Sequence, residues 1–338
     1  MKSYRIKTFN RIDGIVEQGE PVPVPKNDEV LVKIMAVSLN KRDISILNKT
    51  YPLPPNSGII PLSDGAGEVI ATGNTVTKFR AGDRVSGAYF PKWRSGRFGT
   101  DVMDQLGCTL DGMLAEYVCL KEDYLIRIPD YLSWEEASTL PCAGLTAWAA
   151  LKDISPAHTI LTMGTGGVSL FALQFAKMRG AKVIALTSRN KKVQALYDMG
   201  ADKVIDTKEN TNWDLSVMEA TNQRGVDRVI ETGGSETLLR SVKSGAIGGE
   251  IILLNPAAEH SVEINLNQLT YSMFVRLLSI RTQFVGSRHD FEDMNEALIT
   301  NQLRPIITKT FSFNEIHQAY EFFSKGEHLG KVVIRVGI

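Results

Sequence analysis

The segment Gly164-Thr165-Gly166-Gly167 constrains the fold of this chain more than any other stretch of its sequence. It separates an apolar run at 159–163, which has the length of a buried strand, from a stretch at 168–179 whose apolar residues recur at helical spacing. A strand that passes through glycines directly into a helix is typical of a crossover between neighbouring parallel strands. The sequence therefore predicts a parallel sheet with helices packed on it.

The middle of the chain repeats this alternation. We expect further strands at 182–187, 203–206, 226–232, 250–255 and 279–285, with helices at 190–199, 212–223 and 236–243 between them. Strands that alternate with helices of this length indicate an α/β fold, a doubly wound sheet with right-handed crossovers.

The glycine segment is also the first candidate binding site. Residues without a Cβ let backbone N–H groups approach a pyrophosphate, and the N-terminus of the following helix attracts anions. The usual third glycine falls at Ser169, so we expect the helix to stand slightly further from the strand. The residues predicted to contact a dinucleotide are Gly164, Thr165, Gly166, Gly167 and Val168. The alternative is a glycine-rich turn without a ligand.

The end of the strand at 182–187 indicates which nicotinamide dinucleotide would bind. An acidic residue there would hold the ribose 2′-OH of NAD and repel a 2′-phosphate. The stretch 187–192 has two hydroxyls, three cations and no acid. Because Arg binds phosphate with two donors and Lys adds positive charge, the sequence favours NADP(H) over NAD(H). The residues assigned to this role are Thr187, Ser188, Arg189 and Lys192; alternatively, the lysines are only solvated residues in the first turn of a helix.

Ligands of a doubly wound sheet bind beyond the carboxyl ends of its strands, so residues that follow the other predicted strands are further candidates. These are Gly233, Asn255, Gly286, Ser287 and Arg288. Ordinary turn chemistry is the alternative for each of them.

The two ends of the chain have a different pattern. Short apolar runs at 29–39, 67–73, 83–90 and 113–120 are separated by Gly, Pro and Asp, which predicts a small, partly open β-barrel. At the other end we expect helices at 289–302 and 314–326 and a strand at 331–336.

Charge and cysteine content exclude several classes of protein. Lys plus Arg and Asp plus Glu both number 38, and this zero net charge argues against nucleic-acid or membrane-surface binding through bulk charge. Three scattered cysteines are too few for a disulfide framework. No apolar run approaches the roughly 18 residues that span a bilayer, and the first residues lack the apolar core of a signal peptide. We expect a cytoplasmic protein of two domains.

Seven segments of the sequence carry a resemblance to a known family. They are 38–43 (SLNKRD), 61–73 (PLSDGAGEVIATG), 79–85 (FRAGDRV), 110–118 (LDGMLAEYV), 140–148 (LPCAGLTAW), 164–177 (GTGGVSLFALQFAK) and 330–334 (GKVVI). Together they resemble the medium-chain dehydrogenase/reductase superfamily, most closely its zinc-free, quinone oxidoreductase-like branch, which includes proteins called zinc-type alcohol dehydrogenase-like. The resemblance implies a GroES-like catalytic domain at 1–126 plus 287–338 and a Rossmann cofactor domain at 127–286.

In the zinc alcohol dehydrogenases of this superfamily, Cys, His and Cys hold the catalytic metal. The resemblance places these positions at Asn40, Ser63 and Cys142, and only the last is a plausible ligand. Asp64 adds one carboxylate, and the region that would hold the structural zinc, roughly 91–110, offers only Cys108. We therefore expect no metal, and Cys142 as a small buried residue.

Without zinc, hydrogen bonds must stabilise a developing oxyanion, which suits substrates that accept hydride readily, such as quinones, enones and other activated carbonyl compounds. The candidate donors are Asn40 and Tyr51, because relatives place an Asn and a Tyr at comparable positions. Alternatively, Asn40 only caps a helix that begins at Lys41, and Tyr51 only packs. The resemblance also implies contacts of Thr146 with the nicotinamide and of Lys331 with the dinucleotide.

The sequence thus predicts an NADPH-dependent, metal-free oxidoreductase acting on a small molecule. A zinc-independent alcohol dehydrogenase-like enzyme is one alternative, and an NADPH-binding sensory or structural protein with little turnover is another. Since relatives commonly associate through edge strands of the Rossmann sheet, we expect a homodimer or homotetramer. No nucleic-acid or membrane partner is expected.

Overall fold

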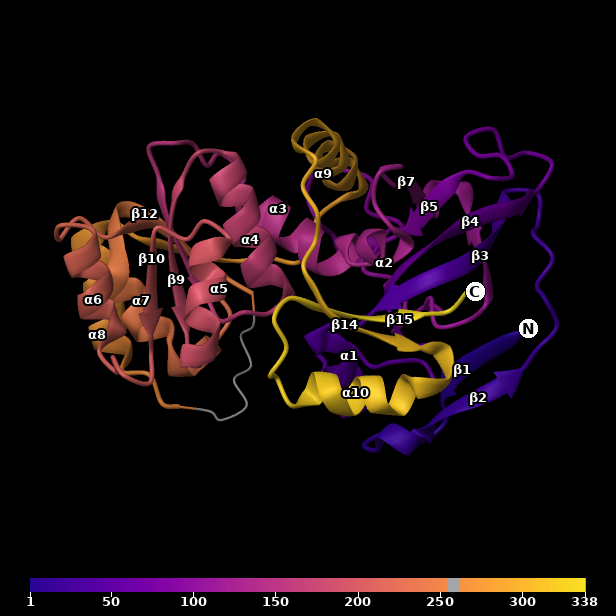
Figure 1. Cartoon of the computed structure of the whole chain (residues 1–338), viewed down its shortest axis with the longest axis horizontal. Coiled ribbons are helices and arrows are strands. Elements are labelled where there is room, and N and C mark those ends of the chain that lie inside the picture. The colour runs from indigo at the N-terminus through magenta and orange to yellow at the C-terminus, as the bar shows by residue number, and fades with distance from the viewer. Residues whose placement is uncertain (255–261, 338) are drawn as a thin grey trace. The chain divides into compact units, whose positions relative to one another are not determined.

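The computed structural model describes residues 1–254 and 262–337, and the chain forms two compact units (Figure 1). Unit 1 contains Met1–Leu145 and Val285–Ile338, and unit 2 contains Thr146–Phe284. Unit 1 is therefore built from both ends of the chain, as the resemblance implied.

Unit 2 is a six-stranded parallel sheet with the strand order β10-β9-β8-β11-β12-β13. Its strands are β8 (Thr159–Met163), β9 (Lys182–Thr187), β10 (Lys203–Asp206), β11 (Val226–Glu231), β12 (Gly245–Leu253) and β13 (Ser279–Thr282). Its helices are α4 (Gly167–Met178), α5 (Val193–Asp198), α6 (Trp213–Ala220), α7 (Leu238–Ser244) and α8 (Leu266–Arg276), while α3 (Leu145–Ala150) begins at the boundary between the units. This is the strand order of a Rossmann fold, and it confirms the predicted doubly wound sheet.

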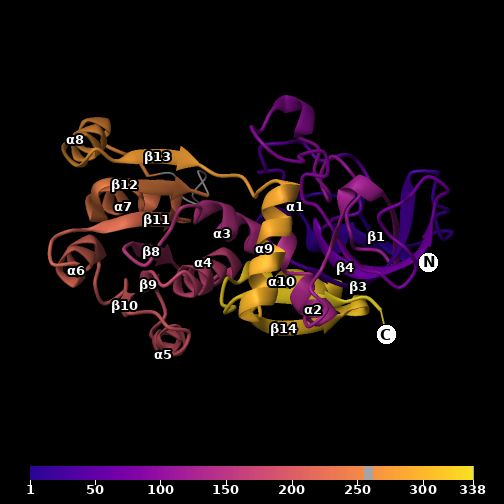
Figure 2. The same ribbon diagram turned by 90° about the horizontal axis from the view of Figure 1, so that it is seen from above.

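Helices cover both faces of this sheet. Figures 1 and 2 show α4 and α5 on one face and α6, α7 and α8 on the other. Inner strands such as β8 and β9 are consequently buried on both sides and read as apolar runs in the sequence, whereas the edge strand β13 is partly exposed. Leu161, Ile184, Val229 and Ile251, one from each of four neighbouring strands, are among the buried residues of the core.

Unit 1 contains a seven-stranded sheet with the strand order β14-β15-β3-β4-β5-β7, in which the seventh strand, β6, also pairs with β3. The strands are β3 (Glu29–Ser38), β4 (Asp64–Thr72), β5 (Arg84–Gly87), β6 (Tyr117–Lys121), β7 (Leu125–Arg127), β14 (Ile307–Ser312) and β15 (Lys331–Arg335), with a separate pair β1 (Lys2–Ile6) and β2 (Ile15–Gly19). The helices are α1 (Lys41–Leu47), α2 (Trp134–Ala137), α9 (Arg288–Asn301) and α10 (Ile316–Ser324). The long strand β3 joins the two ends of the chain, because it pairs with β4 and with the C-terminal strand β15.

The boundary between the units differs from the expected one at residue 126. Residues 127–145 belong to unit 1, where α2 contacts β3 and β4. The hydroxyl of Tyr131 also donates to the backbone carbonyls of Leu298, at 2.9 Å, and Leu303, at 2.5 Å. These contacts tie the segment to the C-terminal part of unit 1, and no local signal in the sequence marks them.

The strands differ from the sequence-based expectations in several places. The β1–β2 pair was not expected. Residues 113–116 lie before β6 begins and bond elsewhere: the N–H of Met113 donates to Leu62 O at 2.8 Å, and Leu114 O accepts the N–H of Tyr4 in β1 at 3.0 Å. The strand β12 starts at Gly245 rather than at 250, because this glycine-rich stretch is extended and pairs with β11. The strand β13 ends at Thr282, before the expected end at 285.

Within the part of the chain that the structure describes, no helix has the length and apolar character needed to span a bilayer.

Candidate active site

The loop after β8 has the backbone expected of a phosphate cradle. Gly164 has φ +73°, a left-handed conformation that glycine adopts without strain. Gly166 is the residue before α4 and has an ordinary φ of −75°. A Cβ added at Gly164 or Gly166 would meet no atom within 4 Å. The packing of the chain therefore does not demand glycine at 166, whereas a pyrophosphate approaching the backbone does.

Ser169 takes the place of the usual third glycine by bonding to the strand. Its buried hydroxyl donates to the carbonyl of Met163, the last residue of β8, at 2.5 Å. The hydroxyl of Thr232, which follows β11, donates to the same carbonyl at 3.2 Å. The serine thus links the first turn of α4 to the end of β8, and Val168 beside it is half-buried.

Lys192 supplies a cation at the glycine loop. The residue is buried, and its ammonium donates to the hydroxyl of Thr165 at 2.7 Å. The alternative interpretation of Lys192 as a solvated residue was therefore wrong, whereas Lys191 is exposed. Because the Lys192 ammonium is bound to Thr165, the second residue of the loop, it adds positive charge where the phosphates of a dinucleotide would bind.

The end of β9 carries no carboxylate. Thr187 is buried, and its hydroxyl accepts the N–H of Arg189 at 3.2 Å, which forms a short turn. Ser188 is exposed and Arg189 half-buried. Two carboxylates near this strand end accept hydrogen bonds from neighbours: Glu209 accepts from the amide of Asn190 at 3.1 Å, and Asp206, paired with Thr187 across β10 and β9, accepts the N–H of Lys208 at 2.9 Å.

A buried carboxylate shapes the turn after β11. Glu231 has no exposed surface and accepts the N–H groups of Gly233, at 2.6 Å, and Gly234, at 3.1 Å. The hydroxyls of Thr237 and Ser241 donate to it as well. A Cβ at Gly233 would lie 2.4 Å from Thr237 Oγ1, so the chain itself requires this glycine. Sequence reasoning missed Glu231, because its hydrogen-bond donors come from the turn and the helix that follow it.

Several predicted cofactor residues lie in other elements than expected, and their cofactor roles stay predictions. Gly286, Ser287 and Arg288 do not follow a strand of the parallel sheet, because β13 ends at Thr282 and α9 of unit 1 begins at Arg288. Ser287 caps that helix: its hydroxyl accepts the N–H of Asp290 at 3.2 Å. Thr146 is buried in α3 of unit 2. Asn255 lies outside the described residues.

In unit 1, Asn40 is held by a buried lysine from the opposite end of the chain. Lys331 Nζ donates to Asn40 Oδ1 at 2.6 Å and to Leu39 O at 2.8 Å, and it lies 3.5 Å from Asp64 Oδ2. Lys331 and Asp64 are 2% and 0% exposed. Lys331 is thus an interior residue of unit 1 whose ammonium binds Asn40 and lies beside Asp64, and its contact with the dinucleotide stays a prediction.

The lysine fixes the orientation of the Asn40 amide. An ammonium only donates, so the amide oxygen must face Lys331 and the NH₂ group must point away from it. Asn40 Nδ2 is buried and has no hydrogen-bond partner among the described residues. Leaving such a donor unsatisfied costs about 1–3 kcal/mol. Asn40 does stand at the N-cap of α1, as the alternative interpretation held, yet its amide keeps a donor for a ligand.

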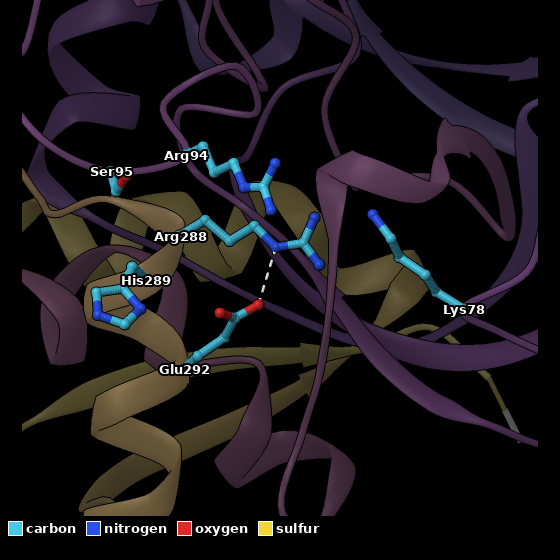
Figure 3. A pocket seen from close by; sticks show the side chains of 6 residues that line it. All are labelled: Lys78, Arg94, Ser95, Arg288, His289 and Glu292. Atoms are coloured by element: carbon cyan, nitrogen blue, oxygen red, sulfur yellow. Dashed lines mark hydrogen bonds and ion pairs between the residues drawn. The ribbon is translucent and has the colours of Figure 1, made fainter.

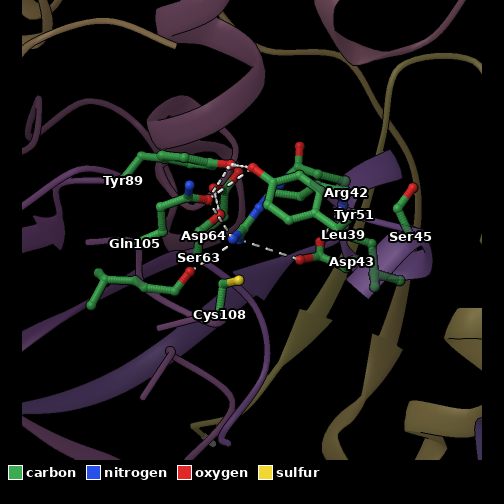
Figure 4. Close-up of polar contacts among 12 residues, drawn as sticks. Leu39, Arg42, Asp43, Ser45, Tyr51, Ser63, Asp64, Tyr89, Gln105 and Cys108 are labelled. Carbon is green, nitrogen blue, oxygen red and sulfur yellow. Dashed lines mark hydrogen bonds and ion pairs between the residues drawn. The ribbon is translucent and has the colours of Figure 1, made fainter. Parts of the chain in front are cut away.

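Tyr51 belongs to a second buried cluster, shown in Figure 4. Its hydroxyl lies 2.8 Å from Gln105 Oε1 and 3.0 Å from the hydroxyl of Tyr89. The guanidinium of Arg42 lies over the rings of Tyr89, at 4.6 Å, and Tyr51, at 5.3 Å, and donates to Gln105 Oε1 at 3.1 Å. Burial opposes the charge of Arg42, but the two phenols and Asp43 outweigh it and raise the pKa of the guanidinium.

The amide oxygen of Gln105 has more donors than it can use. Arg42, Tyr51 and Tyr89, at 3.2 Å, all point at Oε1, whereas a carbonyl oxygen has two lone pairs. When Tyr51 turns its proton to a ligand and Tyr89 turns its own to the Tyr51 oxygen, Gln105 Oε1 still accepts from Arg42, so no buried acceptor is left unpaired. Arg42, Tyr89 and Gln105 were not identified from the sequence, because no local motif joins these three positions.

The side chains at the expected metal positions do not fit a catalytic zinc. Asn40 Oδ1 binds Lys331, and Ser63 donates to Asp64 at 2.8 Å. Burial raises the pKa of the Cys142 thiol far above its ordinary value, which keeps the sulfur protonated. Among the described residues, no group of three or more His, Cys, Asp or Glu side chains could hold a metal ion. A dication at Asp64 would also repel the ammonium 3.5 Å away.

Comparisons with known proteins agree with this architecture. Residues 26–130 match the sequence model of the alcohol dehydrogenase GroES-like domain, and residues 167–300 match that of the zinc-binding dehydrogenase domain. A zinc-type alcohol dehydrogenase-like protein of Schizosaccharomyces pombe is 37% identical over 333 residues, which cover 96% of each chain.

Two solved structures extend the comparison. A structure described as an NAD-dependent alcohol dehydrogenase is 27% identical over the full length of both chains, with a TM-score of 0.90. The quinone oxidoreductase of Coxiella burnetii is 25% identical over 99% of both chains, with a TM-score of 0.78.

Proposed function

The chain belongs to the medium-chain dehydrogenase/reductase superfamily, and from this premise we propose that it is a metal-free, NADP(H)-dependent reductase of quinones, enones or similar activated carbonyl compounds. It is an oxidoreductase with a nicotinamide cofactor, as its relatives are. The choice of NADP(H), the independence from zinc and the class of substrate are the parts proposed here.

One observation carries the choice of reaction: the buried, unpartnered N–H donor of Asn40. A carbonyl oxygen that accepts this bond gains negative charge as hydride arrives, so the bond strengthens in the transition state. The clamp by Lys331 means that the donor is oriented before the substrate binds. An alcohol substrate would instead need a group that lowers its hydroxyl pKa, which is what zinc does in the related enzymes.

The bound cofactor would supply the hydride from its nicotinamide ring, and the protein orients the reactants and supplies the proton. Tyr51 is the proposed proton donor for the reduced substrate. The guanidinium of Arg42 beside its ring favours the negative charge that forms on the phenol oxygen as the proton leaves. Tyr89 donates to the Tyr51 oxygen from 3.0 Å and stabilises it further.

Selection of NADP(H) rests on the end of β9. Ser188, Arg189 and Lys191 follow Thr187 without a carboxylate, so a 2′-phosphate would meet cations and a hydroxyl rather than like charge. We expect Arg189→Ala to weaken NADPH binding by about tenfold or more and NADH binding little. Calorimetric titration of both nucleotides measures this, and equal losses for the two would refute the assignment.

The reaction is tested by following the near-ultraviolet absorbance of NADPH while the protein is mixed with a panel of quinones, enals and alkyl aldehydes. We expect turnover of the quinones and enals that is unchanged by chelators. Alcohol oxidation with NADP⁺, measured in parallel, examines the alternative suggested by the alcohol dehydrogenase relatives. Activity that appears only with added zinc would contradict the proposal, and so would tight NADPH binding without turnover of any compound.

A further inference from the structure

A polar pocket of about 400 Å³ lies within unit 1, lined by residues that the proposed reaction does not use. It is lined by Lys78, Arg94, Ser95, Arg288, His289 and Glu292 (Figure 3). These residues come from the loop after β4, the loop after β5 and the first turn of α9, so three distant segments of the chain converge there. Its volume falls in the range of small-molecule sites, about 300–1,000 Å³.

The lining is cationic. Lys78, Arg94 and Arg288 face one carboxylate in the lining, that of Glu292. Outside the lining, Asp123 pairs with Lys78 and lies 3.6 Å from Arg288, and Asp293 lies 3.7 Å from His289. The excess of cations therefore belongs to the lining itself. The positive end of the 14-residue helix α9 adds to this field.

Arg288 is fixed in place. Its side chain is only 14% exposed, and its guanidinium donates to Asp123 O at 2.6 Å and to Glu292 Oε1 at 3.0 Å. The N–H groups of Arg288 and His289 donate to the carbonyls of Trp93, at 2.9 Å, and Arg94, at 3.0 Å. The backbone that carries Arg94 is thereby attached to the helix that carries Arg288.

Arg94 interacts with a carboxylate only at longer range: Lys78, first, and then Arg288 and Arg94 lower the pKa of Asp123. The Arg94 side chain is exposed, and no carboxylate of the described residues lies within ion-pair distance of it. In Figure 3 the Arg94 and Arg288 side chains extend toward the side of the pocket where Lys78 lies. Three cations converge on a lining that holds one carboxylate, so they repel each other, and a bound polyanion would relieve that repulsion.

We propose that this pocket binds a phosphate group, with the guanidiniums of Arg94 and Arg288 and the ammonium of Lys78 as its donors. Planar guanidiniums match the oxygens of a phosphate with paired hydrogen bonds, and the Ser95 hydroxyl can donate a further one. The volume exceeds that of a free phosphate ion, so the group favoured is a phosphate monoester of a small organic molecule. The residues that line the site belong to unit 1, whereas the dinucleotide loop belongs to unit 2.

Calorimetry with two probes tests the proposal. The protein is first saturated with NADPH, so that phosphate cannot enter the dinucleotide site, and is then titrated at low salt with inorganic phosphate and with phenyl phosphate. Arg94→Gln is the test variant, because its side chain makes no contact that folding requires. Arg97→Gln is the matched control, since it is an exposed arginine of the same loop outside the lining.

We expect saturable binding to the wild type and to Arg97→Gln, weakened about tenfold or more in Arg94→Gln. Tighter binding of phenyl phosphate than of inorganic phosphate would identify a monoester, and equal binding would identify the free ion; either result supports a phosphate site. The absence of saturable heat from both probes would overturn the proposal. Equal weakening by the two variants would also overturn it, because that pattern is the signature of unspecific charge attraction.

Discussion

Single side chains that are distant in sequence decide the chemistry proposed for this protein. Asn40 has its amide oriented by Lys331, which lies 291 residues further along the chain. The hydroxyl of Tyr51 lies within hydrogen-bond distance of Gln105 and Tyr89, which are 54 and 38 residues further along the chain. A motif can place Asn40 and Tyr51 in a candidate site, as it did here, but it carries no information about partners that only the folded sheet brings together.

Asp43 gives unit 1 a pH-dependent stability. Burial, opposed by Arg42, raises the pKa of this carboxyl from 3.8 to about 6. The unfolded chain therefore loses this proton at lower pH than the folded chain. Between about pH 4 and pH 6 the folded state holds more protons, so stability falls as pH rises, by about 3 kcal/mol over the whole window.

We expect Asp43→Asn to remove the loss of stability that the wild type shows as pH rises from about 4 to 6. The asparagine oxygen can still accept the N–H of Asn40, which Asp43 Oδ2 accepts at 2.7 Å. The melting temperature of the variant, compared with that of the wild type, should therefore rise progressively from pH 4 to pH 7. A difference that shrinks over that range would mean that the carboxylate is stabilised, not penalised, by its surroundings.

Among the elements, the strand–loop–helix unit β8–α4 was the most predictable. Its strand, its glycines and its helix were all expected at nearly their observed positions, because helical spacing and glycine are local signals. The end of β13 was misplaced, because the chain leaves the parallel sheet after Thr282 and no turn signal distinguishes that exit from a longer strand. The role of Lys192 at the loop also depends on a fold contact, between Thr165 and a residue 27 positions away.

Gly166→Ala tests the loop as an element. The φ of −75° and the empty space at this position allow an alanine without strain in the free protein. Its methyl group would occupy the space that the pyrophosphate needs. We expect a melting temperature within a few degrees of the wild type and NADPH binding weakened about tenfold or more, measured by calorimetry.

Gly19→Ala is the matched control for that variant, because position 19, at the end of β2 in unit 1, has equally open space. It should leave NADPH affinity unchanged. If Gly166→Ala bound NADPH as tightly as Gly19→Ala, the pyrophosphate could not lie against this loop.

At the scale of the whole molecule, an apolar surface on unit 2 indicates self-association. Tyr271, Phe274 and Leu277 at the end of α8 are 70%, 78% and 72% exposed, and the chain passes from there directly into the edge strand β13. Among the described strands, β13 pairs only with β12. Exposed aromatic residues beside an unpaired edge strand are typical of an interface, and we propose that a second copy of this chain covers them.

We expect the wild type to be a dimer or tetramer in sedimentation at micromolar concentration, and Phe274→Asp to shift it toward the monomer. Leu215→Asp is the control, since Leu215 lies in α6 of the same unit and is 65% exposed. A monomeric wild type, or the same shift in both variants, would be inconsistent with this surface as the interface.

The division into units shows where sequence information ends. The alternating middle of the chain and the barrel-like beginning were recognisable, since each pattern is repeated over many residues. The assignment of residues 127–145 to unit 1 was not, because it rests on Tyr131 and α2, which bond to segments far away in the sequence. Asn40 of unit 1 and the glycine loop of unit 2 were nevertheless both found, because each lies in a short segment with its own signature.

The central claim is that the buried amide N–H of Asn40 stabilises the oxyanion during hydride transfer. Asn40→Asp keeps an oxygen for Lys331 and removes the donor, so the most direct measurement is the single-turnover rate of NADPH oxidation, in wild type and variant, with the best substrate of the quinone and enal panel. We predict a rate about 100-fold or more lower in the variant with NADPH affinity unchanged. A variant that transfers hydride at the wild-type rate would contradict the account.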